Sequence, residues 1–437
     1  MHYNKKKTEK TTRPADKPNF QSHRKSYSAL IHELAKENAP VKTEANYIDW
    51  LGQFDYPLEL KLKNQAFSSF WKTAGLPEKP KLIIPSPKPR GYRTTTKRQV
   101  YAVGKQYYLT FNNLTLPEKK QLVTTSILEP DEHAAIYQLL AEKLNLPAYR
   151  VVSEILNYVI IRGNYSEFTV IFNVLGMTAE IVRKLKNLSE HLTKLPHPVV
   201  SAFIYVDETA SDYYLESKRP QEVMSFKKIF GHDKIFVSYK GRKFLYNPTS
   251  FSQINESIVP LMIDHVESII KPDKLKRLLD LYCGYGLFAH SFSEKFGETV
   301  GMDSEGPSIK SARENSAYFK PEIPAMFVPK KITPNNLEHY LPESGFIDES
   351  FILDPPRLGT EPGVIEWAAE RKPNHVAHIF CGVDQIPKEI RRWLASGYDV
   401  ESVQPFDMFP GSPNLEVVVS LKPKAAPQRI APKKNVR

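Results

Sequence analysis

The spacing of hydrophobic residues changes twice along this chain. Before residue 80, apolar side chains such as Leu58 and Leu62 recur three or four positions apart, which predicts amphipathic helices. Between residues 149 and 246, apolar and polar residues alternate, and this period of two predicts the strands of an antiparallel α+β section. From about residue 250, short apolar runs alternate with helical segments, which predicts a mostly parallel sheet with helical crossovers.

These changes also predict the domain organisation. The last two apolar runs, 399–406 and 415–422, are separated by a short loop and predict a hairpin at the edge of the parallel sheet. We expect five parts: a disordered basic tail at 1–27, a helical segment at 28–79, an α+β domain at 80–247, an α/β domain at 248–421 and a second basic tail at 422–437.

Basic residues are concentrated at the two ends of the chain. The formal net charge is +11, from 60 Lys and Arg and 49 Asp and Glu. The two predicted tails together carry a net charge of +12, so the body between them has −1 and is close to neutral. Basic tails favour a polyanionic partner such as nucleic acid, and a tail that only aids solubility is the alternative.

A third basic stretch lies inside the chain, at residues 88–98. It places five Lys and Arg residues around Tyr92, and basic groups with an interleaved aromatic suit an RNA-facing surface. The alternative is a solvated strand edge that its charges protect from aggregation.

Several classes of protein are excluded by composition. The only cysteines are Cys283 and Cys381, too few for a disulfide framework, a cysteine-rich zinc site or a four-cysteine iron–sulfur cluster. No run of about 18 apolar residues occurs, so we expect no membrane span. The N-terminus is basic without an apolar stretch behind it, which does not fit a secretory signal. We therefore expect a cytoplasmic protein without a metal site.

A glycine-containing loop follows the first strand of the predicted parallel sheet. In residues 280–286, Asp-Leu-Tyr-Cys-Gly-Tyr-Gly, Gly284 and Gly286 let the backbone approach a ligand closely. The second strand ends at Asp303, where a carboxylate can accept hydrogen bonds from both ribose hydroxyls of a nucleoside cofactor. The third glycine of the dinucleotide fingerprint and the lysine of a phosphate-binding loop are missing, which favours S-adenosylmethionine. A glycine turn with a capping acid is the alternative.

Three chemically useful side chains are expected at one edge of the same sheet. Asp354 and Cys381 follow the fourth and fifth strands, and Glu416 opens the last, antiparallel strand, so all three lie where open α/β sheets bind ligands. Methylation of uracil at C5 needs these groups. A thiolate adds to C6 and makes C5 nucleophilic, and a carboxylate then removes the C5 proton.

With these residues the chain resembles the S-adenosylmethionine-dependent RNA uracil-5-methyltransferases that act on tRNA and 23S ribosomal RNA. The matching motifs are Phe-Ser-Gln-Ile-Asn (251–255), the glycine loop (280–286), Asp-Pro-Pro-Arg-Leu-Gly (354–359) and the stretch 404–416. The resemblance implies a C-terminal Rossmann-like class I methyltransferase domain with a seven-stranded sheet, preceded by an RNA-facing α+β section. It also implies the following site: Gln253, Tyr282, Gly284, Asp303 and Asp354 around the methyl donor, Cys381 as nucleophile, Glu416 as general base, and Phe251 and Asn255 shaping the pocket.

The chain departs from this family at two points. Many members carry an iron–sulfur cluster on early cysteines, and this chain has no cysteine before Cys283, so we expect no cluster. The family's nucleophile usually lies in Ser-Cys-Asn-Pro, whereas residues 380–383 read Phe-Cys-Gly-Val. This difference motivates the main alternative, an RNA-binding protein with weak or no activity that retains the methyltransferase fold.

A further alternative is a methyltransferase acting on cytosine C5 or on a small molecule. Cytosine-5 RNA enzymes tend to use two pocket cysteines, and Cys283 lies in the donor loop, where we interpret it as packing. No heptad pattern occurs, so we expect a monomer.

Overall fold

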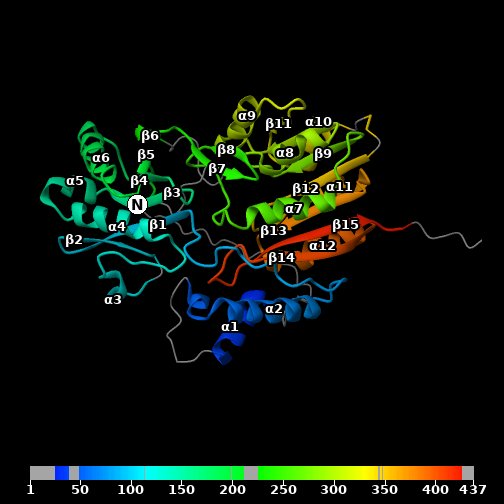
Figure 1. Cartoon of the computed structure of the whole chain (residues 1–437), viewed down its shortest axis with the longest axis horizontal. Helices are drawn as coiled ribbons and strands as arrows, with labels where there is room; N and C mark the ends of the chain where they lie inside the picture. The colour runs from blue at the N-terminus through cyan, green and yellow to red at the C-terminus, as the bar shows by residue number, and fades with distance from the viewer. Residues whose placement is uncertain are drawn as a thin grey trace, which may run out of the picture.

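Two sheet-based lobes lie side by side in the computed structural model of this chain, with the N-terminal helices along the lower edge (Figure 1). The structure describes residues 25–38, 49–112, 114–197, 199–210, 225–342, 345–346 and 348–425. Most of both predicted basic tails, residues 1–24 and 426–437, lies outside the described residues. Tyr27, which the sequence placed in the first tail, is instead a buried residue that opens helix α1 (Tyr27–Asn38).

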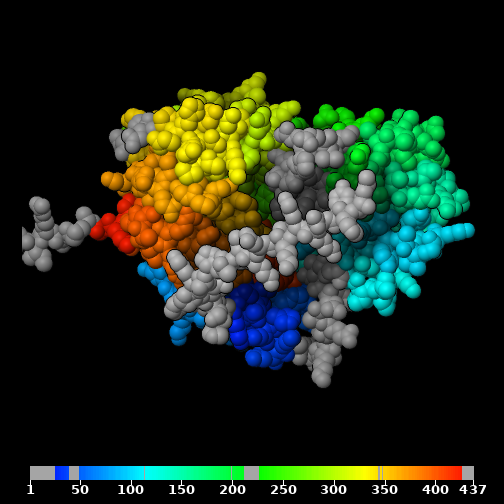
Figure 2. All heavy atoms as spheres, turned by 180° about the vertical axis from the view of Figure 1, so that it is seen from behind, coloured from blue at the N-terminus to red at the C-terminus, as the bar shows by residue number. Residues whose placement is uncertain are grey.

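The N-terminal segment is helical, as its spacing predicted. The short helix η1 (Trp50–Gln53) precedes α2 (Tyr56–Thr73). Asp55 caps α2 by accepting a hydrogen bond from the Leu58 amide at 2.8 Å, and a proline lies in the first turn, where its missing N–H is not needed. The buried side of α2 joins the same hydrophobic core as the strand residues Val403 and Val419. Viewed from behind, the blue N-terminal helices again form the lower edge of the molecule (Figure 2).

The first lobe contains a six-stranded sheet within the described residues. Its order is β2 (Gln106–Thr110), β1 (Thr95–Val103), β3 (Leu156–Gly163), β4 (Phe168–Val174), β5 (Val199–Val206), β6 (Ser225–Gly231). The neighbours pair antiparallel except β4 and β5, which are parallel. The expectation of a wholly antiparallel section is wrong at this pair, because α6 (Ala179–Leu192) carries the chain back over the sheet.

Helices cover one face of this sheet. Helix α4 (Asp131–Leu144) and α6 share a core with the alternate residues of β3, β4 and β5. The smaller helical elements are α3 (Leu116–Lys119), η2 (Pro147–Tyr149) and α5 (Arg150–Ser153). The period-two pattern read from residue 149 onward is therefore wrong for residues 150–153, which form a helical turn before β3 begins. A separate hairpin, β7 (Ile235–Tyr239) and β8 (Arg242–Tyr246), follows the sheet.

The second lobe contains a seven-stranded sheet, counted over the described residues. Its order is β11 (Met326–Pro329), β10 (Glu298–Asp303), β9 (Lys276–Leu281), β12 (Asp348–Leu353), β13 (His375–Phe380), β15 (Glu416–Pro423), β14 (Tyr398–Phe406). The pairs from β11 to β13 are parallel, and β15 runs antiparallel to both its neighbours. This sheet confirms the predicted fold class and the closing hairpin. Its last strand, β15, extends through Lys422, which the sequence had placed in the tail.

Helices lie on both sides of this second sheet (Figure 1). They are α7 (Val259–Ile270), α8 (Leu287–Phe292), η5 (Ser293–Lys295), α9 (Pro307–Phe319), α10 (Pro334–Tyr340), α11 (Val364–Glu370), η6 (Val383–Gln385) and α12 (Ile386–Ala395). In the part of the chain that the structure describes, no helix is both long and apolar enough to cross a membrane.

Candidate active site

The glycine-containing loop after β9 turns the chain sharply into α8. Tyr282, Gly284 and Gly286 all have positive φ angles, of 66°, 56° and 85°. A Cβ at Gly286 would lie 2.7 Å from the buried ring of His290, so this position requires glycine on both conformational and steric grounds. A Cβ at Gly284 would meet no described atom within 4 Å. The outer side of the loop at Gly284 is therefore open space into which a ligand fits.

Asp303 lies next to this opening at the end of β10. Its carboxylate accepts hydrogen bonds from the amides of Gly284, at 2.7 Å, and Ser304, at 2.6 Å. Burial raises the pKa of Asp303, while these two amides lower it. The structure therefore brings Asp303 and Gly284, two residues singled out from the sequence, into direct contact.

Tyr282 points toward a residue that the sequence did not reveal. Its hydroxyl donates a hydrogen bond to Glu361 Oε2 at 2.6 Å. The Glu361 charge also raises the pKa of Asp303, so the carboxylates of Glu361 and Asp303 face the same region. Glu361 lies outside the quoted motifs, and only the path of the chain after β12 brings it to the donor loop.

Asp280 is a second site residue that sequence reasoning missed, although it belongs to the quoted glycine loop. One carboxylate oxygen accepts the Ala289 amide at 2.8 Å, and the other has no hydrogen-bond partner among the described residues. Burial, then the charges of Asp354 and Asp303, raise the pKa of Asp280 to about 8. Burial and Asp303 likewise raise the pKa of Asp354 to about 7. Three crowded carboxyl groups thus surround the loop.

This arrangement fits S-adenosylmethionine. The donor carries a positive sulfonium and a ribose with two hydroxyls. Crowded carboxylates with raised pKa values favour a cation, and the unpartnered Asp280 oxygen shows that the protein alone does not satisfy them. The open space at Gly284 beside the Asp303 carboxylate suits a nucleoside ribose.

Cys381, Glu416 and Asp354 converge, as the strand order predicted. Cys381 follows β13 and is half-buried, with its Sγ 3.8 Å from the Pro355 carbonyl oxygen. Burial raises the pKa of the Cys381 thiol, and the charges of Glu416 and Asp354 raise it further. The charge of Arg357 acts in the opposite direction.

Glu416 is buried at the start of β15. Its Oε2 atom lacks a hydrogen-bond partner within the described ranges. Burial raises the pKa of Glu416 well above its usual range, Asp354 raises it further, and Arg357 lowers it. Arg357 is thus the cation of this cluster, and the sequence reasoning quoted it within a motif without assigning it a role.

The unusual Phe-Cys-Gly-Val turn has a steric explanation. A Cβ at Gly382 would lie 2.7 Å from the Arg357 carbonyl oxygen, closer than a real side chain can approach. Glycine at this position therefore lets the Asp354–Arg357 loop pack directly against the turn that carries Cys381.

The segment that contains Gln253 is anchored by a buried arginine from the other lobe. Arg162 of β3 donates hydrogen bonds to the carbonyl oxygen of Ser250, at 2.6 Å, and to Ser252 Oγ, at 2.7 Å. Gln253 follows these residues and is buried, whereas Phe251 is 55% exposed. The place of Gln253 at the methyl donor stays a prediction.

Asn255 joins distant pieces of the chain, and its place beside the pocket stays a prediction. It is fully buried, and its amide donates to Ser86 Oγ at 2.9 Å and to the Met408 carbonyl oxygen at 3.1 Å.

The basic stretch 88–98 differs from its sequence interpretation. Tyr92 is fully buried and donates a hydrogen bond to the Pro410 carbonyl oxygen. Arg98 is 1% exposed and forms a bidentate ion pair with Glu129. The expectation of an RNA-facing aromatic with basic neighbours is therefore wrong for Tyr92 and Arg98, because buried acids and carbonyl groups from distant segments engage them.

Comparisons with known proteins show which proteins this chain is similar to. Residues 217–322 match the tRNA (uracil-5-)-methyltransferase family model. An uncharacterised RNA methyltransferase of Thermotoga maritima is 24% identical over 91% of this chain and 88% of its own length. A 23S rRNA (uracil(747)-C(5))-methyltransferase of Pyrococcus abyssi is 28% identical over 44% of each chain. This chain spans about half the length of several such curated relatives.

A solved structure shows the same fold. The tRNA (uracil-54, C5)-methyltransferase of Pyrococcus abyssi, in complex with S-adenosyl-L-homocysteine, superposes with a TM-score of 0.61 at 18% identity, over 87% of each chain. These comparisons confirm the predicted resemblance: the chain shares its fold with this methyltransferase and is similar in sequence to RNA uracil-5-methyltransferases.

Proposed function

We propose that this protein transfers a methyl group from S-adenosylmethionine to C5 of a uridine in structured RNA, either tRNA or 23S ribosomal RNA. The observation that carries this proposal is the convergence of Cys381, Glu416 and Asp354 beside the loop of Gly284 and Asp303. A nucleophile, a base and a donor site at one sheet edge are the groups that methylation at uracil C5 requires.

The donor site is built from the chain's own residues. Gly284 leaves room for the nucleoside, Asp303 accepts the ribose hydroxyls, and Tyr282 and Gln253 border the site. The carboxylate of Asp354 faces the positive charge. When bound, S-adenosylmethionine supplies an electrophilic methyl carbon.

Cys381 begins the reaction. Its thiolate adds to C6 of the uracil, and the electrons of the C5–C6 double bond move toward C5 and O4. C5 can then form a bond to the methyl carbon while the bond between that carbon and the donor sulfur breaks, and S-adenosylhomocysteine would leave with the sulfur electron pair. Arg357 aids this step, because its positive charge opposes the burial and the carboxylates that raise the pKa of Cys381.

Glu416 completes the reaction as the base. It takes the proton from C5, the C5–H electrons re-form the C5–C6 double bond, and the C6–Sγ bond breaks to release the Cys381 thiolate. Burial raises the pKa of Glu416, and a raised pKa makes the ionised carboxylate a stronger proton acceptor.

Two exposed apolar side chains support a nucleic-acid substrate. Leu358, directly after Arg357, is 83% exposed, and Phe251 is 55% exposed. A uracil inside a base stack cannot reach Cys381, so it has to leave the stack. Exposed apolar and aromatic groups beside a site suit such a substrate, because they can stack on bases or separate them.

The test is methyl transfer from labelled S-adenosylmethionine to unmodified tRNA and 23S ribosomal RNA transcripts, read by nucleoside mass spectrometry. We expect 5-methyluridine with the wild type and none with Cys381→Ala. Cys283→Ala is the matched control, since Cys283 is the other cysteine and packs in a small core beside Ile309. Binding of RNA and donor without any 5-methyluridine would instead support the inactive RNA-binding alternative.

A further inference from the structure

The loop between β14 and β15 leads directly into the proposed base. In the ladder between these strands, Phe406 of β14 lies opposite Glu416 of β15, and the nine residues 407–415 close the hairpin. The backbone of Glu416 is therefore paired with β14 and joined directly to this loop, so a displacement of the loop acts on it at the end of the ladder. We call residues 407–415 the base loop.

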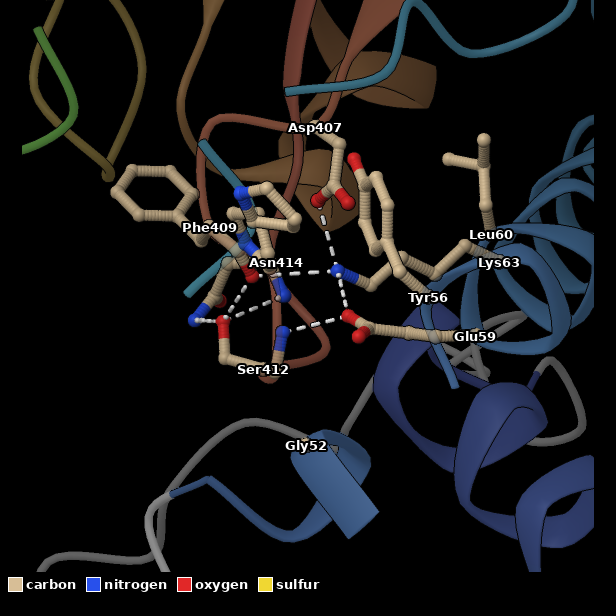
Figure 3. Close-up of polar contacts among 12 residues, drawn as sticks. Gly52, Tyr56, Glu59, Leu60, Lys63, Asp407, Phe409, Ser412 and Asn414 are labelled. Atoms are coloured by element: carbon tan, nitrogen blue, oxygen red, sulfur yellow. Dashed lines mark hydrogen bonds and ion pairs between the residues drawn. The ribbon is translucent and has the colours of Figure 1, made fainter. Parts of the chain in front are cut away.

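The N-terminal helical segment holds the base loop through a buried ammonium group. Lys63 of α2 places its Nζ atom 2.7 Å from Asp407 Oδ1 and 3.2 Å from the Phe409 carbonyl oxygen. The same Nζ lies 2.9 Å from Glu59 Oε1 (Figure 3). Glu59 also accepts a hydrogen bond from the Gly411 amide at 2.5 Å. One cluster thus contacts the base loop at three positions.

The cluster is electrically balanced, and three of its four charged side chains are fully buried. The side chains of Glu59, Lys63 and Asp407 are fully buried. Arg90 reaches the other oxygen of Glu59 at 2.9 Å, which gives two positive and two negative groups. Burial opposes the charged form of Lys63, but Asp407 and Glu59 outweigh it and raise the pKa of Lys63, so the ammonium remains charged. Paired buried charges tolerate little displacement, because each would lose its partner.

Nothing in the proposed reaction uses these residues directly. Asp407 belongs to the motif stretch 404–416, yet its carboxylate points toward Lys63 of α2 (Figure 3). We propose that Lys63 is a positioning residue: by tying α2 to Asp407 and Phe409, it holds the base loop, and with it the Glu416 carboxylate, where that carboxylate takes the C5 proton. This inference rests on the proposed function.

The position of Glu416 matters for one step only. Addition of Cys381 Sγ to C6 and formation of the new C5–CH₃ bond do not need the base. Removal of the C5 proton, which re-forms the C5–C6 double bond and expels the Cys381 thiolate, does. A displaced Glu416 therefore leaves methylated RNA attached to the protein, whereas a general loss of structure lowers every step together.

The experiment compares Lys63→Met with wild type under single turnover, with labelled S-adenosylmethionine and unmodified tRNA or 23S ribosomal RNA transcripts. Denaturing gels separate the label in covalent protein–RNA adduct from the label in free RNA. The matched control is Lys61→Met, an exposed lysine on the same helix. Tyr92→Phe is a second, milder variant, because it removes only the hydroxyl that donates to the Pro410 carbonyl of the base loop.

We expect Lys63→Met to raise the ratio of adduct to free methylated RNA at least tenfold, with Lys61→Met equal to wild type. Tyr92→Phe is expected to raise the ratio of adduct to free methylated RNA by a smaller factor. If Lys63→Met does not fold, this variant tests whether the base loop positions Glu416. The positioning role would be overturned if the ratio is unchanged in both variants. It would also be overturned if the amounts of adduct and of free methylated RNA fall in equal proportion. Wild type that yields neither adduct nor 5-methyluridine would instead overturn the proposed function, and this inference with it.

Discussion

Replacing Lys63 with methionine is expected to cost several kcal/mol of folding free energy. The methionine keeps most of the side-chain volume but removes the charge that neutralises Asp407 and one of the two ion pairs of Glu59. At about 3 Å and an effective dielectric constant of about 20, each ion pair contributes roughly 5–6 kcal/mol of Coulomb energy. The desolvation of the buried charges offsets much of this gain. Breaking such a buried pair therefore lowers the free energy of unfolding by about 3–5 kcal/mol.

A double variant separates this charge effect from a packing effect. In Lys63→Met combined with Asp407→Asn, one positive and one negative charge leave together, and Glu59 keeps its ion pair with Arg90. We expect the double variant to recover at least half of the loss. The exposed control Lys61→Met should change stability by less than about 0.5 kcal/mol.

The assay is urea unfolding followed by tryptophan fluorescence, since Trp71 lies buried on the same helix as Lys63. The midpoints are compared at equal slope, so that a change in midpoint reports a change in stability. A loss below about 1 kcal/mol in Lys63→Met, or a double variant less stable than the single one, would refute the reasoning. Either result would mean that the buried carboxylates do not depend on the ammonium.

Three further predictions concern the site and the core. Arg357→Ala is expected to raise the pKa of Cys381 further, because the positive charge of Arg357 is lost. Iodoacetamide should then alkylate Cys381 more slowly than in wild type at each pH, and an equal rate would contradict this prediction. Gly284→Ala places a Cβ in the donor opening at a φ of 56°. We expect this variant to weaken S-adenosylmethionine binding at least tenfold by calorimetry, while the free energy of unfolding falls by only about 1–2 kcal/mol. Unchanged affinity would argue against the donor site. Burial, then the charge of Arg98, lowers the pKa of His133 to about 3, so between pH 6.5 and about 3 the unfolded chain binds a proton that the folded chain does not. The free energy of unfolding should therefore fall as the pH falls through this range. In urea unfolding at pH 4.5–6.5, His133→Gln should flatten this pH dependence by up to about 1.4 kcal/mol per pH unit, and an unaltered slope would contradict the argument.

Much of the candidate site was accessible from the sequence because it lies at strand ends. In a parallel sheet the strands deliver their following residues to one edge, so Asp354 and Cys381 could be placed together without knowing any side-chain contact. Gly284 and Asp303 were found for a similar reason, since a tight turn needs glycine and a strand end exposes a carboxylate. These arguments need only backbone topology, which hydrophobic periodicity largely determines.

Residues whose role depends on a distant partner could not be interpreted from the sequence. Arg98 looks like a surface cation until Glu129 is seen beside it. Glu361 lies outside the quoted motifs, and Asp280 lies inside the glycine-loop motif without a role that the sequence reveals. Their importance comes from burial and from the carboxylates that surround them.

The sequence by itself determined the alternation of strands and helices in the second lobe and the chemistry available at its sheet edge, because local periodicity and turn chemistry encode both. The tertiary structure alone decided which charges are buried and how the base loop is held. Lys63 and Asp407 are 344 residues apart in the chain and 2.7 Å apart in space. The reason is that burial of a charged side chain is unfavourable unless the fold places an oppositely charged partner beside it. Such a partner can come from any part of the chain, so no short stretch of sequence predicts the ion pair.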